Sequence, residues 1–241
     1  MSPDEVLDNP VWAALSGPHA RFAEPLGRFA EPLGRFAEPR GRAARYHPDI
    51  SPFAGLADPA DPAGWRDLAA VAGPGAQLGM SAHRLTVPAG WERLRVMPAV
   101  QLVGTDVDAA PDPEAVALTG ADVPEMLDLV SRTQPGPFRK RTLELGRYLG
   151  IRRGGALIAM AGERLRVPGY TEISAVCTDP AHRGQGLAAR LILAVATGAR
   201  DRGELPFLAA VTENEAALRV YRRIGFTDRA QVVFHVLRVP A

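Results

Sequence analysis

The stretch from residue 172 to residue 188 constrains the fold most strongly, because four kinds of local signal follow one another within it. Residues 172–178 are short, apolar and partly β-branched, which is typical of a buried strand. Asp179-Pro180 ends that strand. Residues 187–199 are rich in alanine and leucine, which favours a helix. The sequence therefore predicts a strand, a turn, a glycine-rich loop and a helix.

The glycine-rich loop Arg183-Gly184-Gln185-Gly186 carries little side-chain bulk and can bend sharply. A helix that begins at such a loop directs unpaired N–H groups and the positive end of its dipole to one place. The loop is therefore a candidate phosphate-binding site.

Strands and helices alternate regularly after residue 114. Asp122 is predicted to cap a helix with the apolar stripe Val123, Met126, Leu127 and Val130. Gly154-Gly155 predicts the turn of a hairpin. Further strands are expected, with the hairpin arms, at 115–118, 148–152, 156–165, 207–211 and 232–239.

Asn214 is predicted to cap the last helix and Gly225 to end it. The resulting order is strand, helix, three strands, helix, strand, helix, strand. This order predicts an α/β fold, a mixed sheet flanked by helices, with an N-terminal α/β extension.

The first 105 residues carry weaker signals. Residues 21–41 repeat the sequence Arg-Phe-Ala-Glu-Pro, and the proline in each copy argues against a coiled coil and favours a surface insertion. A helix is predicted after Asp61-Pro62, and a strand at 96–103. The acidic, proline-rich residues 106–113 are predicted to link residues 1–105 to a second domain at 114–241.

The composition of the chain limits the partners and the cellular compartment that we expect. The formal net charge of +1 argues against a nucleic-acid partner, and the single cysteine, Cys177, excludes an internal disulfide. No signal-peptide pattern or membrane-length apolar run is present, so we expect a cytoplasmic protein without a membrane partner. No metal site is expected.

Two interpretations of the loop compete. Gly184-x-Gly186-x-x-Ala189 fits a relaxed dinucleotide-binding pattern, which would indicate a nicotinamide-dependent oxidoreductase. That pattern requires the strand to run almost directly into the first glycine, whereas residues 179–183 intervene. Too few residues follow the loop to complete a doubly wound fold.

In the alternative interpretation, Arg183-x-x-Gly186-x-Ala188 resembles the pyrophosphate loop of the GNAT superfamily of acyl-CoA-dependent N-acyltransferases. Asn214-x-x-Ala217-x-x-x-Tyr221-x-x-x-Gly225-Phe226 is similar to the fourth-helix signature of that family. The resemblance covers residues 114–241. Residues 1–105 resemble the degenerate first half found in glycine N-acyltransferase-like members.

The resemblance implies acetyl-CoA as the acyl donor, with its pyrophosphate on the loop and its pantetheine arm beside the strand at 172–178. It implies that a backbone N–H of Ala175 or Val176 holds the thioester oxygen. The residues expected to contact the donor are Ala175, Val176, Cys177, Thr178, His182, Arg183, Gly184, Gln185, Gly186, Leu187, Ala188, Asn214 and Ala217.

Transfer to an amine is aided by a base that takes the amine proton and by an acid that protonates the leaving thiolate. The family position assigns Tyr221 as the acid that protonates the leaving thiolate, and Glu172 is the candidate base because it opens the strand. Cys177 could instead act as a nucleophile, but it has no evident histidine partner and is interpreted as a packed residue. The sequence thus predicts an N-acetyltransferase with a small-molecule or peptide amine as acceptor; the alternative is a non-catalytic acyl-CoA-binding or regulatory module.

Overall fold

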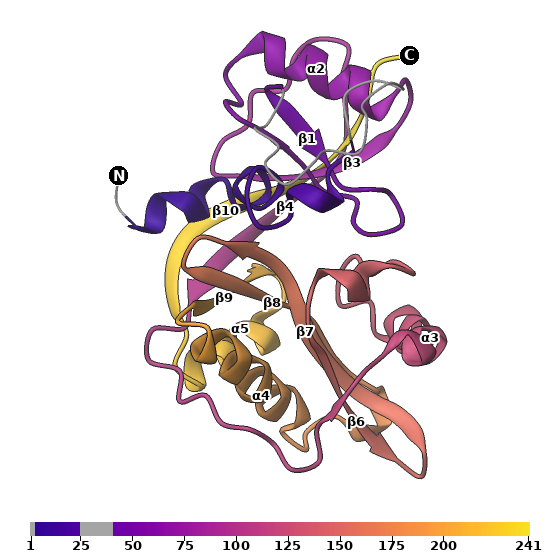
Figure 1. The fold of residues 1–241 in the computed structure, drawn as a ribbon, viewed down its shortest axis with the longest axis vertical. Helices are drawn as coiled ribbons and strands as arrows, with labels where there is room; N and C mark the ends of the chain where they lie inside the picture. Colours follow the sequence, from indigo (N-terminus) through magenta and orange to yellow (C-terminus); the bar gives the residue numbers. More distant parts are fainter. Residues whose placement is uncertain (1–2, 25–40) are drawn as a thin grey trace. The chain divides into compact units, whose positions relative to one another are not determined.

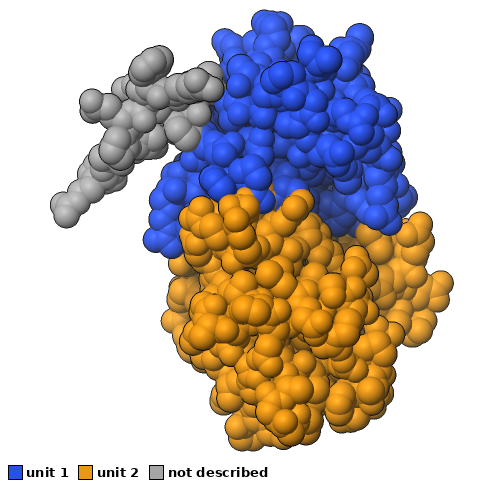
Figure 2. Space-filling view, turned by 90° about the vertical axis from the view of Figure 1, so that its right-hand side faces the viewer, with its two compact units in different colours: residues 1–48, 52–99, 231–241 blue, residues 49–51, 100–230 orange. Residues whose placement is uncertain are grey.

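The structure is a computed structural model that describes residues 3–24 and 41–241. Most of the repeat at 21–41 lies outside the described residues. The chain divides into two compact units, coloured separately in Figure 2. Unit 1 consists of residues 1–48, 52–99 and 231–241, and unit 2 of residues 49–51 and 100–230. No helix in the described part of the chain has the length and apolar character needed to cross a membrane.

Unit 2 contains the regular alternation that the sequence predicts (Figure 1). Strands β6, β7 and β8 form an antiparallel meander, and β8 pairs with β9 in parallel. The strand order is β4-β9-β8-β7-β6-β5, so the sheet is mixed. Its elements are β5 (Val116–Ala117), α3 (Val123–Thr133), β6 (Tyr148–Arg153), β7 (Ala156–Val167), β8 (Tyr170–Thr178), α4 (Leu187–Asp201), β9 (Leu205–Val211) and α5 (Glu215–Arg223).

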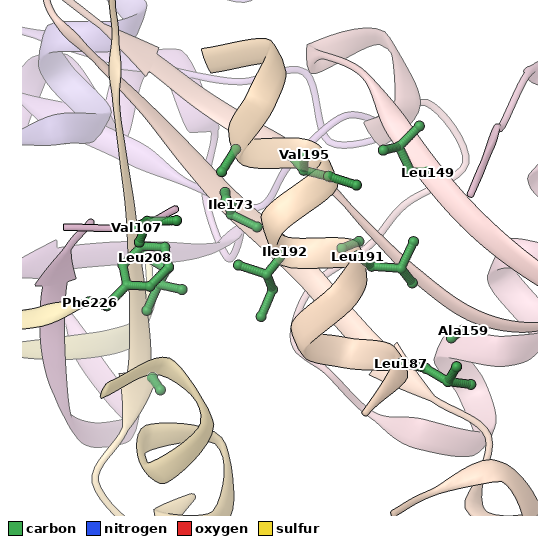
Figure 3. Close-up of a cluster of buried hydrophobic side chains, with 14 of the residues drawn as sticks. Val107, Leu149, Ala159, Ile173, Leu187, Leu191, Ile192, Val195, Leu208 and Phe226 are labelled. Carbon is green, nitrogen blue, oxygen red and sulfur yellow. The ribbon is translucent and has the colours of Figure 1, made fainter. Parts of the chain in front are cut away.

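Side chains from the two faces of this sheet enter separate apolar clusters. Successive strand residues point to opposite faces, so Leu149 joins the cluster beneath α4 whereas its neighbour Tyr148 joins the cluster beneath α3. Figure 3 shows Leu187, Leu191 and Val195 along the inner face of α4 in the first cluster. Because helices cover both faces, the central strands are almost wholly buried.

The start of α3 differs from the prediction. Asp122 makes no side-chain cap for this helix. Its carboxylate accepts instead from the backbone N–H of Thr119, at 2.7 Å, and from Arg152, at 2.6 Å. In the 3-10 turn that precedes α3 (η3, Gly120–Asp122), Asp122 is instead the third residue of a capping box whose N-cap is Thr119. The deeply buried residues of α3 are Met126 and Leu129, and Leu129 was absent from the predicted stripe.

Unit 1 is built from short elements around its own apolar cluster, which includes Trp65, Leu68, Met80 and Leu237. The helix predicted at Asp61-Pro62 is α2, and Asp61 caps it by accepting from the N–H of Ala63 at 2.8 Å. The strand order in this unit is β3-β10-β4. Its elements are η1 (Pro3–Asp8), α1 (Pro10–Leu15), η2 (Ala20–Phe22), β1 (Ala43–Arg45), β2 (Ala54–Leu56), α2 (Pro62–Ala72) and β3 (Gln77–Ala82), with the unit 1 parts of β4 (Glu92–Val103) and β10 (Thr227–Arg238).

The domain boundary predicted at 106–113 stays a prediction, and the compact units divide the chain elsewhere. Both β4 and β10 contribute residues to each unit. Residues 231–241 belong to unit 1 because β10 pairs with β3 from Val233 to Arg238. Neither unit is therefore a single continuous stretch of chain.

Two glycines of unit 2 should respond in opposite ways to substitution by alanine. A Cβ at Gly162 would lie 2.2 Å from Cδ1 of Tyr148, whereas a Cβ at Gly198, inside α4, would meet nothing closer than 3.5 Å. We expect Gly162→Ala to lower the free energy of unfolding by about 1–3 kcal/mol. Gly198→Ala should raise it by roughly 0.5–1 kcal/mol through helix propensity. Urea unfolding measures both, and equal responses would contradict this packing.

Candidate active site

The turn before α4 presents a row of unused backbone donors. Within the described residues, the N–H groups of residues 184–189 donate to no acceptor in the chain, and the first helical bond runs from Arg190 N to Gly186 O, at 3.1 Å. No side chain caps α4 at its N-cap residue, Gly186. Since the dipole of this helix of 15 residues adds positive potential there, the turn is suited to bind an anion.

The backbone of this turn explains its glycines. Gly184 has a φ of +79° and Gly186 has a φ of +74°. Residues that carry a Cβ rarely adopt this backbone conformation. Upstream, Asp179 accepts from the N–H of Ala181 at 2.9 Å, which fixes the short 3-10 turn η5 (Pro180–His182). Asp179 also forms an ion pair with Arg132 of α3. The loop is thus held at its start.

The first turn of α4 is held by a cluster of charges. Arg190 makes a bidentate contact with Asp112, at 2.6 and 2.8 Å, and a further contact with Glu114 at 2.6 Å. The hydrogen bond from Arg190 holds the pKa of Asp112 below its usual value. This arginine holds the predicted linker against the first turn of α4.

Strand β8 changes its pairing in the middle. It pairs with β9 only from Tyr170 to Glu172, although β8 continues to Thr178. On its other side, the register with β7 shifts between Ser174 and Cys177, where β8 carries one extra residue. Ala175 lies in this bulge with φ of +52°. The second half of β8 therefore has an edge that β9 does not occupy.

The predicted helix signature adopts the predicted local structure. Asn214 Oδ1 accepts from the N–H of Ala217 at 3.1 Å and so caps α5. Tyr221 is half-buried on the inner side of α5, next to Phe226, with ring centroids 6.3 Å apart. Burial raises the pKa of Tyr221 to about 12, so its hydroxyl keeps its proton at neutral pH.

Glu172 is buried and paired. Its two carboxylate oxygens accept from Nε and Nη2 of Arg164, at 2.8 and 2.6 Å. The side chains of Arg164 and Glu172 are only 9% and 4% exposed. The assignment of Glu172 as a base stays a prediction, and the structure shows that its first partner is a buried arginine.

The two predicted catalytic side chains lie on opposite faces of β8. Ile173 belongs to the apolar cluster beneath α4, which Tyr221 and Val176 also contact. Glu172 precedes Ile173 in the strand and therefore points to the other face. The structure brings Tyr221 to the face of Val176 but does not bring it to Glu172.

The other predicted contact residues occupy the strand, the loop and the first turn of α4, where Leu187 is buried. Burial raises the pKa of Cys177 to about 11, so its thiol is protonated at neutral pH and poorly nucleophilic. The hydroxyl of Thr178 is buried without a hydrogen-bond partner among the described residues. His182 is half-buried in η5, and Arg183 is exposed, with Nε donating to Thr178 O at 3.4 Å.

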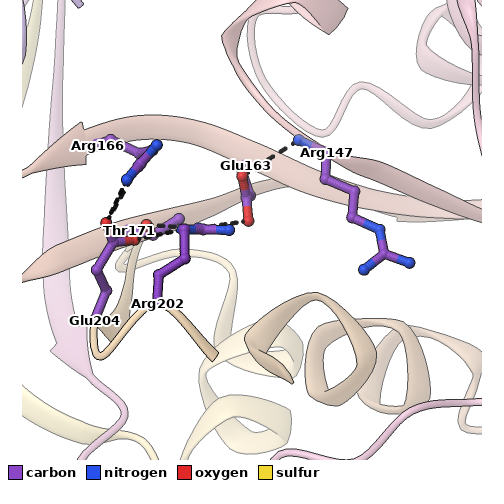
Figure 4. Close-up of polar contacts among 6 residues, drawn as sticks. All are labelled: Arg147, Glu163, Arg166, Thr171, Arg202 and Glu204. Atoms are coloured by element: carbon purple, nitrogen blue, oxygen red, sulfur yellow. Dashed lines mark hydrogen bonds and ion pairs between the residues drawn. The ribbon is translucent and has the colours of Figure 1, made fainter. Parts of the chain in front are cut away.

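The sequence analysis missed a polar network on the face of the sheet opposite Glu172. Glu163, with a side chain 4% exposed, accepts from Arg202 at 2.8 Å. Glu204 accepts from both Arg166 and Arg202, at 2.6 and 3.0 Å, and also from Thr171. Figure 4 shows how the network joins β7 and β8 to the connection between α4 and β9. No motif marks these residues, because the register of distant strands brings them together.

The mixed sheet, the uncapped helix behind a glycine turn and the open half of β8 are together the features of an N-acetyltransferase. The sequence model of the FR47-like protein family matches residues 148–235. The N-alpha-acetyltransferase RimI of Mycobacterium tuberculosis is 36% identical over 121 residues, which is 46% of this chain and 75% of that protein.

Solved structures agree with this class. A GNAT-family acetyltransferase structure from Novosphingobium aromaticivorans is 35% identical over the full length of both chains, with a TM-score of 0.84. A GCN5-related N-acetyltransferase from Kribbella flavida shares the fold at 18% identity, with a TM-score of 0.58 over 83% of this chain and 88% of that one. The chain belongs to the GNAT family of acetyltransferases.

The buried pair Arg164–Glu172 can be tested by a double-mutant cycle. Arg164→Met leaves the Glu172 carboxylate buried without its partner, and we expect a loss of about 3–5 kcal/mol in the free energy of unfolding. Combining it with Glu172→Leu removes both charges and should recover most of that loss. The cycle is measured by urea unfolding. A double variant less stable than Arg164→Met would contradict a direct pair.

Proposed function

We propose that the chain transfers an acetyl group from acetyl-CoA to a primary amine by direct attack on the thioester. The observation that carries the proposal is the row of N–H groups at residues 184–189 that are unused within the described part of the chain, which follows the open half of β8 after the short turn at 179–183. The first feature suits a pyrophosphate, and the second suits the amide-bearing pantetheine arm, which can bond to a free strand edge.

In this proposal the donor lies along β8 towards the loop. The hydroxyl of Thr178, which has no partner among the described residues, offers a buried hydrogen bond to the arm. The bulge at Ala175 interrupts the regular ladder, and in this proposal a backbone N–H of Ala175 or Val176 holds the developing oxyanion there. Asn214 and Ala217 use their cap bond to fix the start of α5, and their contact with the donor is part of the proposal.

The chemical step is a single displacement. The amine nitrogen forms a bond to the carbonyl carbon, and the bond from that carbon to sulfur breaks. The leaving thiolate takes the proton of Tyr221, whose raised pKa keeps it available as an acid. The amine loses its proton towards Glu172, directly or through water, on the opposite face of β8. Acid and base on opposite faces would serve the thiol and the amine separately.

The proposed acceptor follows from the name of a relative. The name of the tuberculosis relative specifies an N-alpha-acetyltransferase. We therefore propose the α-amino group of a peptide as the first acceptor to test, within a panel that includes lysine side chains and small amines. Release of free CoA measures turnover, and failure to acetylate any amine while acetyl-CoA still binds would favour a non-catalytic module.

Replacing the proposed acid should affect the chemical step alone. Tyr221→Phe keeps the ring beside Phe226 and removes the proton donor. We expect kcat to fall by about 100-fold, with little change in the affinity for acetyl-CoA. Because the pKa of Tyr221 is raised to about 12, the ratio of the two kcat values should stay constant from neutral to mildly alkaline pH. Unchanged turnover in the variant would rule out the acid role.

A matched pair of variants tests the base. Glu172→Gln and Glu163→Gln each replace a carboxylate that is 4% exposed and paired with an arginine, but on opposite faces of the sheet. Both should lower stability. Only Glu172→Gln should also reduce kcat, by roughly 10- to 100-fold, if Glu172 takes the amine proton. Equal effects on kcat, measured well below each unfolding temperature, would assign Glu172 a purely structural role.

A further inference from the structure

Residues 104–115 form a strap between β4 and β5 that runs along α4 (Figure 1). These residues include the predicted linker. In the last turn of α4, Arg200 donates to two backbone oxygens at the start of the strap, each at 2.7 Å. In the first turn of α4, Arg190 binds Asp112 near the end of the strap. The strap is therefore attached to both ends of this helix.

The middle of the strap packs against the chain directly after α5. A Cβ at Gly225 would lie 2.5 Å from Asp106 O, so the two backbones are in direct contact. Val107 is buried in the same apolar cluster as Phe226, and Figure 3 shows the two side chains close together. The strap is thus supported along its length, and it can brace the helix beside it.

Asp112 is held more firmly than the rest of the charged cluster. Its side chain is 9% exposed, compared with 42% for Glu114. The carboxylate accepts from Nε and Nη2 of Arg190, at 2.6 and 2.8 Å, and from the backbone N–H of Glu114 at 2.9 Å. Two parallel bonds fix the orientation of the guanidinium as well as its position.

The start of α4 needs a brace because no side chain caps it. A cap would hold the first turn, but it would also occupy N–H groups that an anion could use. Arg190 donates its own N–H to Gly186 O at 3.1 Å, the first helical bond. Holding the Arg190 side chain therefore fixes the first turn from the side and leaves the N–H groups before it unused within the described residues.

We propose that Asp112 is a positioning residue for the acyl donor. Through Arg190 it orients the N–H groups at the start of α4 towards the donor's pyrophosphate, without contacting the donor itself. This role rests on the proposed function, because it takes acetyl-CoA as the ligand of the loop. Donors that are already in place bind an anion without the cost of ordering the turn.

The test compares the full chain with Asp112→Asn, which keeps the acceptor for the Glu114 N–H but loses the bidentate ion pair. We expect the Kd for CoA, measured by calorimetry, to rise about tenfold. Pantetheine has the arm but no pyrophosphate, so it should bind both proteins equally in an NMR titration. A general loss of structure would weaken both ligands.

Two results separate this role from the proposed function. If Asp112→Asn binds CoA as tightly as the unchanged chain, or more tightly, the positioning role is overturned and the donor assignment stands. Tighter binding would mean that Arg190, once released, contacts the phosphates directly. If the unchanged chain does not bind CoA, the proposed function is overturned and this role with it.

Two further variants show whether the geometry of the pair matters. Arg190→Lys keeps the charge but not the two parallel bonds, so it should weaken CoA binding about as much as Asp112→Asn. Arg200→Met is the control, because it releases the strap at the other end of α4. It should lower the midpoint of urea unfolding and leave the affinity for CoA unchanged. The proposal is overturned if Arg190→Lys binds CoA normally, or if Arg200→Met weakens binding equally.

Discussion

Strand β8 has a hydrogen-bonded neighbour on both sides only over its first three residues, Tyr170–Glu172, and the candidate site depends on that restriction. Charged contacts strengthen this doubly paired end of β8 on both faces of the sheet. Arg164 binds Glu172 on one face, and Glu204 binds Thr171 on the other. Beyond them β8 is supported by β7 and by the packed helices. A strand that is fixed at one end can keep a free edge ready for a ligand without moving when it binds.

Arginine suits these contacts better than lysine would. Lys140 is the only lysine of the chain. The planar guanidinium gives Arg164 and Arg190 two parallel bonds each to one carboxylate, which an ammonium group cannot make. The abundance of arginine therefore has a structural use, because it fixes the orientation of the strands and of α4 as well as their charge balance.

The sequence predicted most of unit 2 because its signals are local. The glycines of the loop, the cap at Asn214 and the hairpin turn at Gly154-Gly155 each act within a few residues. The bulge at Ala175 was not predictable, since nothing in an alanine marks a positive φ. The pairing of Arg164 with Glu172, and of Glu163 with Arg202, depends on strand register and helix packing, which no single stretch of sequence specifies. The short strands of unit 1 have too few residues to show a period, and the division into units follows long-range pairing.

The interleaving of the two units has a consequence for synthesis on the ribosome. Strand β10 carries Leu237 and Val239 follows it, and both complete the core of unit 1. These residues emerge only after all of unit 2 has been translated. Domains generally fold in the order in which they are made, yet here the unit that starts first must finish last. The nascent chain therefore carries an exposed β3 edge and an incomplete apolar core throughout the translation of unit 2, and that period is when chaperone binding would matter most.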